Sequence, residues 1–393
     1  MRRCCLALLL IFISQALFSA NILVPKLELI TRGYVEGTGL LLGTQGSMEF
    51  LIAGGFKFGG RILLGFESED LENLESDRSI KFQGAQVVII NPFELPLELS
   101  YFTGENDTFG NGDVFPFYYG ADPIASRFRG FLYFPEETQT QYDGIHTISG
   151  TGIKIASDFQ SDSFRLTLYT YQDQYLGSGN YSADVYASLN LPNFKLESYA
   201  GYSYLSTVDS YFRAGIMLFY DTGLGGEFLT QVGMPVWDIN DPGASTLPIG
   251  LFYFLFEPRV RFGLFSIILT FFLHPQYYFE DKTGEDPPTV QQLLDIKSYY
   301  DTGEEGSADI NANFAFGDPE LSPMSGGIEA RLGTKFSPSS EPDNQLPAFT
   351  AKISPYLSVL ASGVIWDFKI DVKLLPFDLA DIVEGFIGVR AEF

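Results

Sequence analysis

The chain has 393 residues and a formal net charge of −25, with 49 acidic and 24 basic residues. This balance disfavours nucleic-acid binding, which depends on basic side chains that neutralise phosphates. Aromatic residues make up 16% of the chain and charged residues only 19%, below the share of about 25% that is usual in soluble domains. The composition therefore fits a strand-rich membrane protein better than a soluble domain.

Residues 1–20 have the pattern of a secretory signal peptide. Arg2 and Arg3 supply the positive start, a short apolar run follows, and Ala20 is a small residue that suits cleavage. Cleavage one residue earlier is the alternative. Both cysteines of the chain lie in this segment, so the mature chain, residues 21–393, cannot form a disulfide and needs another means of holding its fold. We expect those residues to form one domain.

The mature chain is predicted to cross a membrane as strands. No stretch has the ~20 apolar residues that a transmembrane helix needs. Segments of about ten residues alternate in polarity instead, and turn residues separate them. A soluble sandwich with one wet face shows the same alternation in a single strand, but its repetition along the chain favours an all-β, antiparallel transmembrane β-barrel. About 18 strands are predicted, with 16–20 as the range: 27–42, 47–58, 60–69, 79–91, 95–105, 149–158, 164–175, 181–190, 194–206, 210–221, 226–238, 252–262, 265–279, 308–317, 326–336, 349–362, 365–375 and 384–393.

The connections between these strands are alternately short and long. Such barrels place short turns in the periplasm and long loops outside the cell. The long loops 70–78, 106–148, 239–251, 280–307 and 337–348, together with 376–384, hold 24 acidic and 5 basic residues. The sequence therefore predicts an acidic extracellular rim, which would bias conduction toward cations or bind divalent cations.

Two of these loops carry further signals. The loop 106–148 is the longest and is rich in aromatic residues, so we expect it to fold inward as a constriction. A hairpin that extends the barrel above the membrane is the alternative. Within 280–307, the segment 287–301 has apolar residues at helical spacing, which predicts either a short amphipathic helix or a disordered acidic loop.

Three segments, 256–263, 327–336 and 363–376, show the alternation most clearly. Apolar side chains occupy one face of each strand and charged side chains the other. Because unpaired charges are costly in an apolar environment, we expect the charged face to point into the barrel as a hydrated wall. With two arginines of the longest loop, these charged residues are the predicted pore lining: Arg127, Arg129, Arg259, Arg261, Glu329, Arg331, Lys335, Asp367, Lys369, Asp371 and Lys373.

Signals for catalysis or metal binding are weak. His146 lies close to Ser149, as a base lies close to a nucleophile in a hydrolase, but an ordinary loop histidine explains it better. The segment 104–113 offers oxygen ligands without the spacing of an EF-hand, so a solvated turn is favoured over a calcium site. The sequence therefore predicts no enzyme and no cofactor.

The last segment, 384–393, alternates in polarity and ends in Phe393. It resembles the final strand of Gram-negative outer-membrane β-barrels, in which the terminal aromatic strand is part of the signal for the assembly machinery. The resemblance to the porin-like class concerns the architecture of the whole chain. It implies a place in the cell outer membrane, contact with outer-membrane lipids, and recognition by the assembly machinery through Phe393.

An 18-stranded barrel is wide enough to hold an aqueous channel. We therefore expect a porin-like outer-membrane channel for passive diffusion of small hydrophilic solutes. The alternative is a surface or adhesion-type interaction protein, in which the barrel displays its acidic loops. The sequence leaves open whether the chain forms a homo-oligomer.

Overall fold

The computed structural model describes residues 20–36, 39–54, 57–68, 78–109, 146–157, 163–174, 179–204, 210–238, 251–274, 278–281, 300–303, 306–317, 322–336, 349–376 and 382–392. These residues are almost entirely β-strand. The strands are β1 (Ala20–Glu36), β2 (Gly39–Gly54), β3 (Phe58–Ser68), β4 (Arg78–Ile90), β5 (Leu97–Phe109), β6 (His146–Ser157), β7 (Phe164–Asp173), β8 (Tyr181–Leu191), β9 (Phe194–Tyr204), β10 (Ser210–Asp221), β11 (Gly226–Asp238), β12 (Tyr253–Phe262), β13 (Phe265–His274), β14 (Tyr278–Asp281), β15 (Tyr300–Gly303), β16 (Gly306–Phe316), β17 (Met324–Phe336), β18 (Phe349–Ala361), β19 (Val364–Leu375) and β20 (Val383–Glu392).

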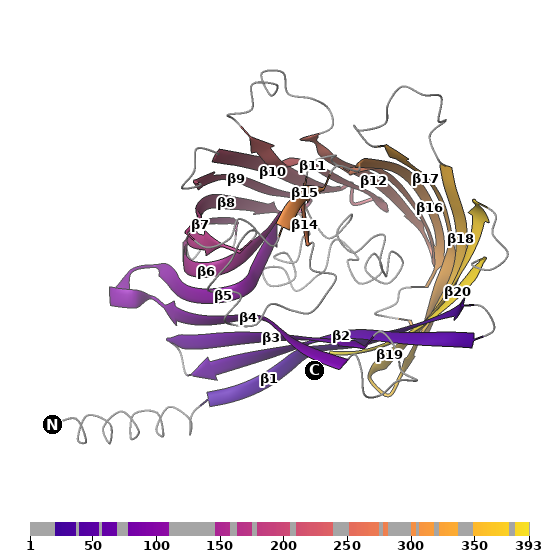
Figure 1. Cartoon of the computed structure of the whole chain (residues 1–393), viewed down its shortest axis with the longest axis horizontal. Helices are drawn as coiled ribbons and strands as arrows, with labels where there is room; N and C mark the ends of the chain where they lie inside the picture. The colour runs from indigo at the N-terminus through magenta and orange to yellow at the C-terminus, as the bar shows by residue number, and fades with distance from the viewer. Residues whose placement is uncertain are drawn as a thin grey trace.

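Eighteen of these strands form a closed antiparallel β-barrel (Figure 1). Each strand pairs with the strands before and after it, and β13 pairs with β16. The ring is completed where β1 pairs with β20, from Lys26 opposite Glu392 to Gly33 opposite Gly385. The described sheet therefore has no free edge, so its strands satisfy one another's backbone hydrogen bonds.

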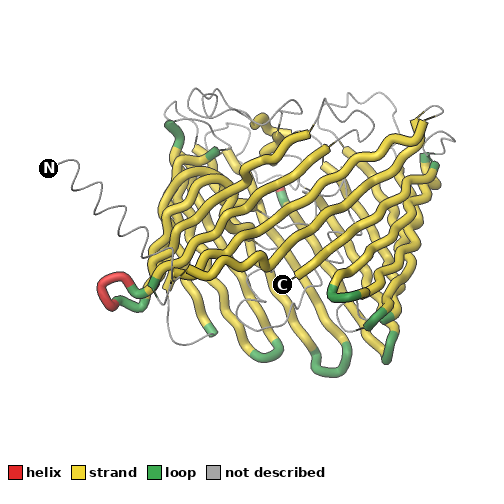
Figure 2. Tube along the Cα trace, turned by 90° about the horizontal axis from the view of Figure 1, so that it is seen from below, coloured by secondary structure: helices red, strands yellow, loops and turns green. Residues whose placement is uncertain are grey.

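The remaining described elements are short. β14 and β15 form a separate two-stranded hairpin, and η1 (Pro92–Glu94) is a single 3₁₀ turn between β4 and β5. The described part of the chain contains no helix that is both long and apolar enough to cross a membrane. Figure 2 shows several short turns (green) side by side at one end of the barrel.

The predicted all-β barrel of about 18 strands is confirmed, but several predicted bounds are wrong. The prediction placed the first two strands at 27–42 and 47–58, whereas β1 ends at Glu36 and β2 begins at Gly39, which pairs with Glu36. The apolar residues continue on both sides of positions 37–38, so their alternation did not mark where β1 ends and β2 begins. The predicted strand 265–279 is also divided, because β13 ends before β14 begins.

Strands also replace the ends of several predicted loops. β5 continues to Phe109 and β6 begins at His146, so only 110–145 remains of the predicted constriction loop, and it lies outside the described residues. The first part of the predicted turn 104–113 is likewise strand. β15 occupies Tyr300–Gly303, so the helix predicted over 287–301 does not reach its predicted end; residues 287–299 lie outside the described part. Most of the predicted acidic rim is also outside it.

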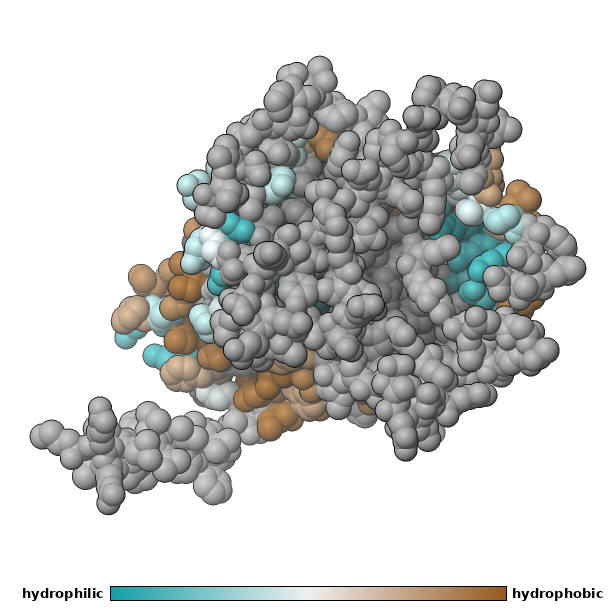
Figure 3. Space-filling view, viewed as in Figure 1, coloured by the Kyte–Doolittle hydropathy of each residue, from teal (hydrophilic) through white to brown (hydrophobic). Residues whose placement is uncertain are grey.

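The two faces of the barrel wall differ in polarity as the alternation predicted. On β19, Phe368 and Ile370 are exposed on the outside, while Asp367, Lys369 and Asp371 are buried on the inside. The inner face of β8 carries Ser, Asp, Tyr, Ser and Asn in alternate positions. Figure 3 shows brown, hydrophobic residues along the outside at lower left and a teal, hydrophilic surface on the inner wall at right. This is the distribution of a barrel in lipid.

Ile370→Arg is expected to lower the free energy of unfolding by about 2–4 kcal/mol, because it places a charge midway along a lipid-facing strand. The measurement is denaturant unfolding of the barrel folded in lipid vesicles. The matched control is Leu264→Arg in the turn between β12 and β13, where an exposed apolar residue stands at the end of the barrel. Its expected cost is at most about 1 kcal/mol. Equal costs at the two positions would contradict the assigned lipid-facing surface.

Candidate functional site

A buried arginine on β10 forms hydrogen bonds with side chains of β7, β8 and β9 on the inner face of the barrel. The Arg213 side chain is 1% exposed. Its guanidinium donates to both carboxylate oxygens of Asp184, over 2.6 and 2.7 Å, and to Ser203 Oγ over 2.6 Å. It also donates to the Tyr171 hydroxyl oxygen over 3.0 Å. This group of four residues, the Arg213 cluster, is a charge-assisted network that offsets the cost of burying its charges.

Strand register and one glycine make this cluster possible. Asp184 on β8 and Arg213 on β10 both pair with Gly201 on the strand between them. The two side chains therefore meet above Gly201. A Cβ atom at this position would overlap the Asp184 carboxylate and lie 2.7 Å from Arg213 Nε. Only glycine leaves the space that the ion pair occupies.

Next to this cluster, aromatic rings from distant strands meet inside the barrel. Phe109 on β5 stacks on Tyr186 of β8 and Tyr199 of β9, with ring centroids 5.1 and 4.7 Å apart. His146 on β6 packs against Phe109 and Tyr199. These four residues, the aromatic corner, are all buried.

The aromatic corner requires sharp local curvature. In an evenly curved barrel of 18 strands, strands four apart would lie on the order of 20 Å from one another, given a spacing of ~4.8 Å and a tilt of ~40°. Two aromatic side chains cannot cover that distance and still stack. Figure 1 shows the corresponding curl of β5–β9 at the left of the barrel. In this sector, the side chains of the wall therefore fill the interior of the barrel.

A second charged group lies on the inner face of β18 and β19. Asp371 accepts one hydrogen bond from Lys352 over 2.9 Å, and its other carboxylate oxygen lies 3.1 Å from the Lys369 ammonium. On the neighbouring strands β16 and β17, Arg331 is 3.0 Å from Asp309. Asn311 donates to Glu329 over 2.7 Å. Asp371 therefore contacts two lysines and Asp309 one arginine, whereas Glu329 accepts its hydrogen bond from a neutral amide.

A third group lies on β11 and β12. Arg259 donates to Glu257, two residues earlier on the same face, over 2.6 Å, and lies 3.7 Å from Glu227. Arg261 is 3.2 Å from Glu227, and its side chain is 50% exposed. Along β12, the side chains therefore change from buried at Glu257 and Arg259 to half exposed at Arg261.

The structure places most of the predicted pore-lining residues on the inner face, where they are less hydrated than expected. The buried ones form direct pairs or hydrogen bonds instead of contacting water. They are Arg259, Glu329, Arg331, Asp367, Lys369 and Asp371. The more open ones are Arg261 and Lys373, whose side chain is 38% exposed and pairs with Glu384 over 2.9 Å. The side chain of Lys335, and all of Arg127 and Arg129, lie outside the described residues, and a pore-lining role stays a prediction for the whole set.

His146 and Ser149 do not form the arrangement of a hydrolase. His146 begins strand β6 and is not a loop residue, and its ring packs in the aromatic corner. The Ser149 hydroxyl donates to Gln174 Oε1 over 2.9 Å. Asp107, from the segment weighed as a calcium site, accepts a hydrogen bond from Tyr169 over 2.6 Å and pairs with Lys154. Within the described ranges, no three His, Cys, Asp or Glu side chains gather as metal ligands.

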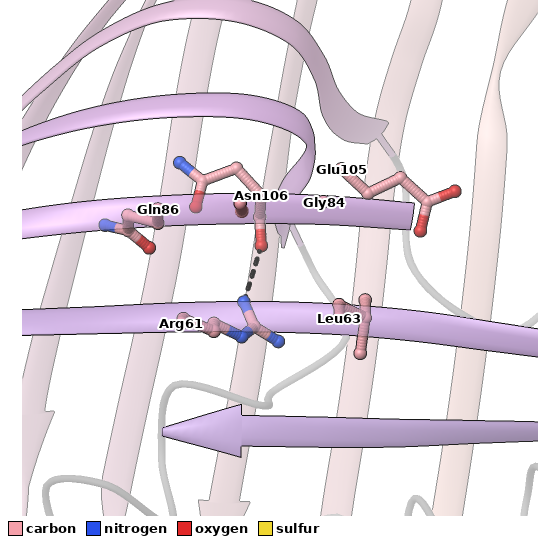
Figure 4. Close-up of a pocket in the computed structure, with 7 residues that line it drawn as sticks. Arg61, Leu63, Gly84, Gln86, Glu105 and Asn106 are labelled. Atoms are coloured by element: carbon pink, nitrogen blue, oxygen red, sulfur yellow. Dashed lines mark hydrogen bonds between the residues drawn. The ribbon is translucent and has the colours of Figure 1, made fainter. Parts of the chain in front are cut away.

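A shallow recess, too small to hold a water molecule, lies where β3, β4 and β5 run side by side (Figure 4). Arg61 donates to Glu49 over 2.6 Å and to the backbone oxygen of Asn106 over 3.0 Å, which ties β3 to β2 and β5. The sequence did not predict this recess. Its lining residues are Arg61, Leu63, Gly84, Ala85, Gln86, Glu105 and Asn106.

Solved structures similar to this one are outer-membrane β-barrel proteins. Wzi of Escherichia coli, described as an outer-membrane protein of group 1 capsule assembly and a carbohydrate-binding β-barrel, matches with a TM-score of 0.50 and 12% identity over 98% of this chain and 87% of that one. A mutant of Rh. blastica porin gives 0.44 and 12% over 95% and 100%. OmpT of Vibrio cholerae, lacking loop L8, gives 0.42 and 9% over 95% and 100%.

No family model matches the chain, and no curated protein matches it. At such low identity, structural similarity establishes the fold alone. The chain thus has the fold of an outer-membrane β-barrel.

Proposed function

We propose that this protein is a porin-like channel of the outer membrane, through which small hydrophilic solutes diffuse passively. The observation that carries the proposal is the closed ring of 18 strands with a polar inner face and an apolar outer face. The proposal includes a cleaved leader over residues 1–20 and assembly through the terminal strand. Phe393, the residue expected to contact the assembly machinery, lies outside the described residues. No enzymatic step is part of the proposal.

Within the barrel, we assign solute passage to the sector around β19, β20, β2 and β3. The pair Lys373–Glu384 and the pair Arg61–Glu49 both lie there, and all four side chains keep some exposure, from 19% to 38%. The aromatic corner fills the sector β5–β9 with buried rings. Partly exposed charges interact with a passing ion, whereas buried and paired ones do not.

Purified protein in a planar lipid bilayer is expected to open discrete conducting channels. Lys373→Glu should shift the reversal potential toward cation selectivity at low salt, because it reverses a charge beside the proposed passage. The shift should decrease as the Debye length falls to ~3 Å at 1 M salt. Lys57→Glu makes the same charge change in the exposed turn between β2 and β3 and should shift the potential less. Correctly folded protein that never conducts would refute the channel.

A surface interaction protein is the second candidate, and one observation favours it. Most inner charges of β7–β10 and β16–β19 are buried and held by ion pairs or hydrogen bonds within the wall, which an open, water-filled wall does not require. A folded barrel without conductance would support this candidate. The barrel would then serve to display its extracellular loops.

A further inference from the structure

The turn between β4 and β5, residues 91–96, is held in a strained conformation. Asn91, Phe93 and Glu94 have φ values of 51°, 56° and 62°, in the left-handed region that residues other than glycine rarely adopt. They are three of the four such residues in the described part of the chain. Pro92 and Pro96 restrict the same backbone with their rings. Strain of this kind concentrates at functional positions, so the turn calls for an explanation.

This turn, the Phe93 turn, exposes two apolar side chains. Phe93 is 93% exposed, and Leu95 is also among the exposed apolar residues. Backbone hydrogen bonds from Leu95 to Pro92 and from Asn91 to Leu97 hold the turn in place. A phenylalanine ring in water lacks the stabilisation that burial would give it. A surface that covers the ring would therefore explain both the exposure and the strain.

The direction of the turn shows which surface that is. Figure 2 shows η1, the red turn, standing out sideways from the barrel wall, whereas several green turns point along the barrel. Figure 1 shows the same segment, between β4 and β5, beyond the wall at the left. The Phe93 turn therefore reaches away from the barrel axis, toward the surroundings of the wall.

The apolar outer face of the wall continues onto the turn. Phe58 begins β3, is exposed, and pairs with Ile89, the last residue but one of β4. Val87 is exposed on the same outer face, two residues before Ile89. The backbone N–H of Ile90 donates to the carbonyl oxygen of Lys57, so the turn begins directly beside Phe58. Phe93 thus extends the surface that the barrel presents to lipid.

A lipid leaflet is the occupant that these observations favour. The lipid that covers Phe58 and Val87 already borders the turn, so no further partner is needed to cover the ring. The turn itself contains Glu94 and no basic residue, so it has no charge to attract an anionic surface. Phospholipids without net charge therefore suit it best.

We propose that the Phe93 turn anchors the barrel laterally in the adjacent phospholipid leaflet. Phe93 and Leu95 insert at the boundary between headgroups and acyl chains, to a depth of about 5–10 Å, and Glu94 stays among the headgroups. Burial of the ring in lipid offsets the strain of the backbone. The inference goes beyond the proposed channel and does not depend on conduction, because it requires only that the barrel lies in lipid.

Tryptophan fluorescence tests the anchor. The two tryptophans of the chain, Trp237 and Trp366, are replaced by phenylalanine, and Phe93→Trp then introduces a single indole. The barrel is folded into vesicles of phosphatidylcholine that carry bromine, a fluorescence quencher, at chosen positions of the acyl chains. The emission of Phe93→Trp should lie at shorter wavelength than that of tryptophan in water. It should lose most intensity when the bromine atoms are near the headgroups.

Asn193→Trp, made in the same background, is the matched control. Only Pro192 and Asn193 join β8 to β9, and both are exposed, so this turn is too short to reach sideways into lipid. Its emission should resemble that of tryptophan in water, and iodide in the buffer should quench it more strongly than the emission of Phe93→Trp. Leu95→Trp repeats the test with Phe93 unchanged and should behave like Phe93→Trp.

Two results would overturn the anchor. The first is emission of Phe93→Trp and Leu95→Trp that matches the Asn193→Trp control, which would place the turn in water. The second is emission that is protected from iodide but insensitive to brominated lipid, which would show that a second copy of the chain covers the ring. Conductance measurements on the same vesicles test the channel separately, because neither result depends on an open pore.

Discussion

Arg213→Met is expected to lower the free energy of unfolding of the barrel by about 3–5 kcal/mol. Arg213 is buried and donates to both oxygens of Asp184, so its removal leaves the buried Asp184 carboxylate without its cationic partner. The measurement is denaturant unfolding of the barrel folded in lipid vesicles. Because the cost comes from the uncompensated charge, Arg213→Met combined with Asp184→Leu should recover a large part of the loss.

Arg61→Met is the matched control for this prediction. Arg61 also pairs with a carboxylate over 2.6 Å, but its side chain is 32% exposed and that of Glu49 is 19% exposed. A pair that keeps contact with solvent contributes little, so the expected loss is at most about 1 kcal/mol. If the two arginine variants lose the same stability, or if the double variant is no better than Arg213→Met, burial is not what makes the Arg213 cluster important.

The second large effect is expected from a single methyl group. Gly201→Ala should lower the free energy of unfolding by about 3 kcal/mol, because the added carbon overlaps the Asp184 carboxylate and separates it from Arg213. Both side chains are held by hydrogen bonds on several sides and have little room to move. Denaturant unfolding in vesicles is again the measurement.

Gly385→Ala serves as the control for Gly201→Ala. Gly385 also lies within a strand, but a Cβ atom there has no neighbour within 4 Å. Its replacement should therefore change stability by less than about 1 kcal/mol, and in the stabilising direction if the unfolded chain loses freedom. A large loss at Gly385 together with none at Gly201 would contradict the geometry of the Arg213 cluster.

Which side chains of a strand face the interior and which face lipid could be predicted, because alternation is a local property of the sequence. Ile370 and its neighbours Lys369 and Asp371 point to opposite sides of any extended strand, whatever the strand pairs with. The pairing of Glu257 with Arg259 follows from the same rule, since residues two apart on a strand share a face. The number of strands was predictable for a related reason, because turn residues interrupt the alternation.

Register and curvature could not be predicted in this way. Asp184 and Arg213 meet because both pair with Gly201, and no local pattern specifies which residues of two strands stand opposite each other. The stack of Phe109 on Tyr199 depends on how sharply β5–β9 bend, which is a property of the whole sheet. The register shifts on β4 and β5 are each a one-residue irregularity that alternation does not reveal.

The pairing of β1 with β20, the seam that closes the ring, has a consequence for the order of folding. All other pairings of the barrel join strands that are consecutive within it, including β13 and β16 on either side of the β14–β15 hairpin, so each can form without contact between the two ends of the chain. The seam instead brings Lys26 beside Glu392. Joining such distant points in a free chain would cost on the order of 5 kcal/mol in entropy. If the other hairpins form first, they bring the two ends close together and remove most of this cost, so we expect closure of the ring to come last.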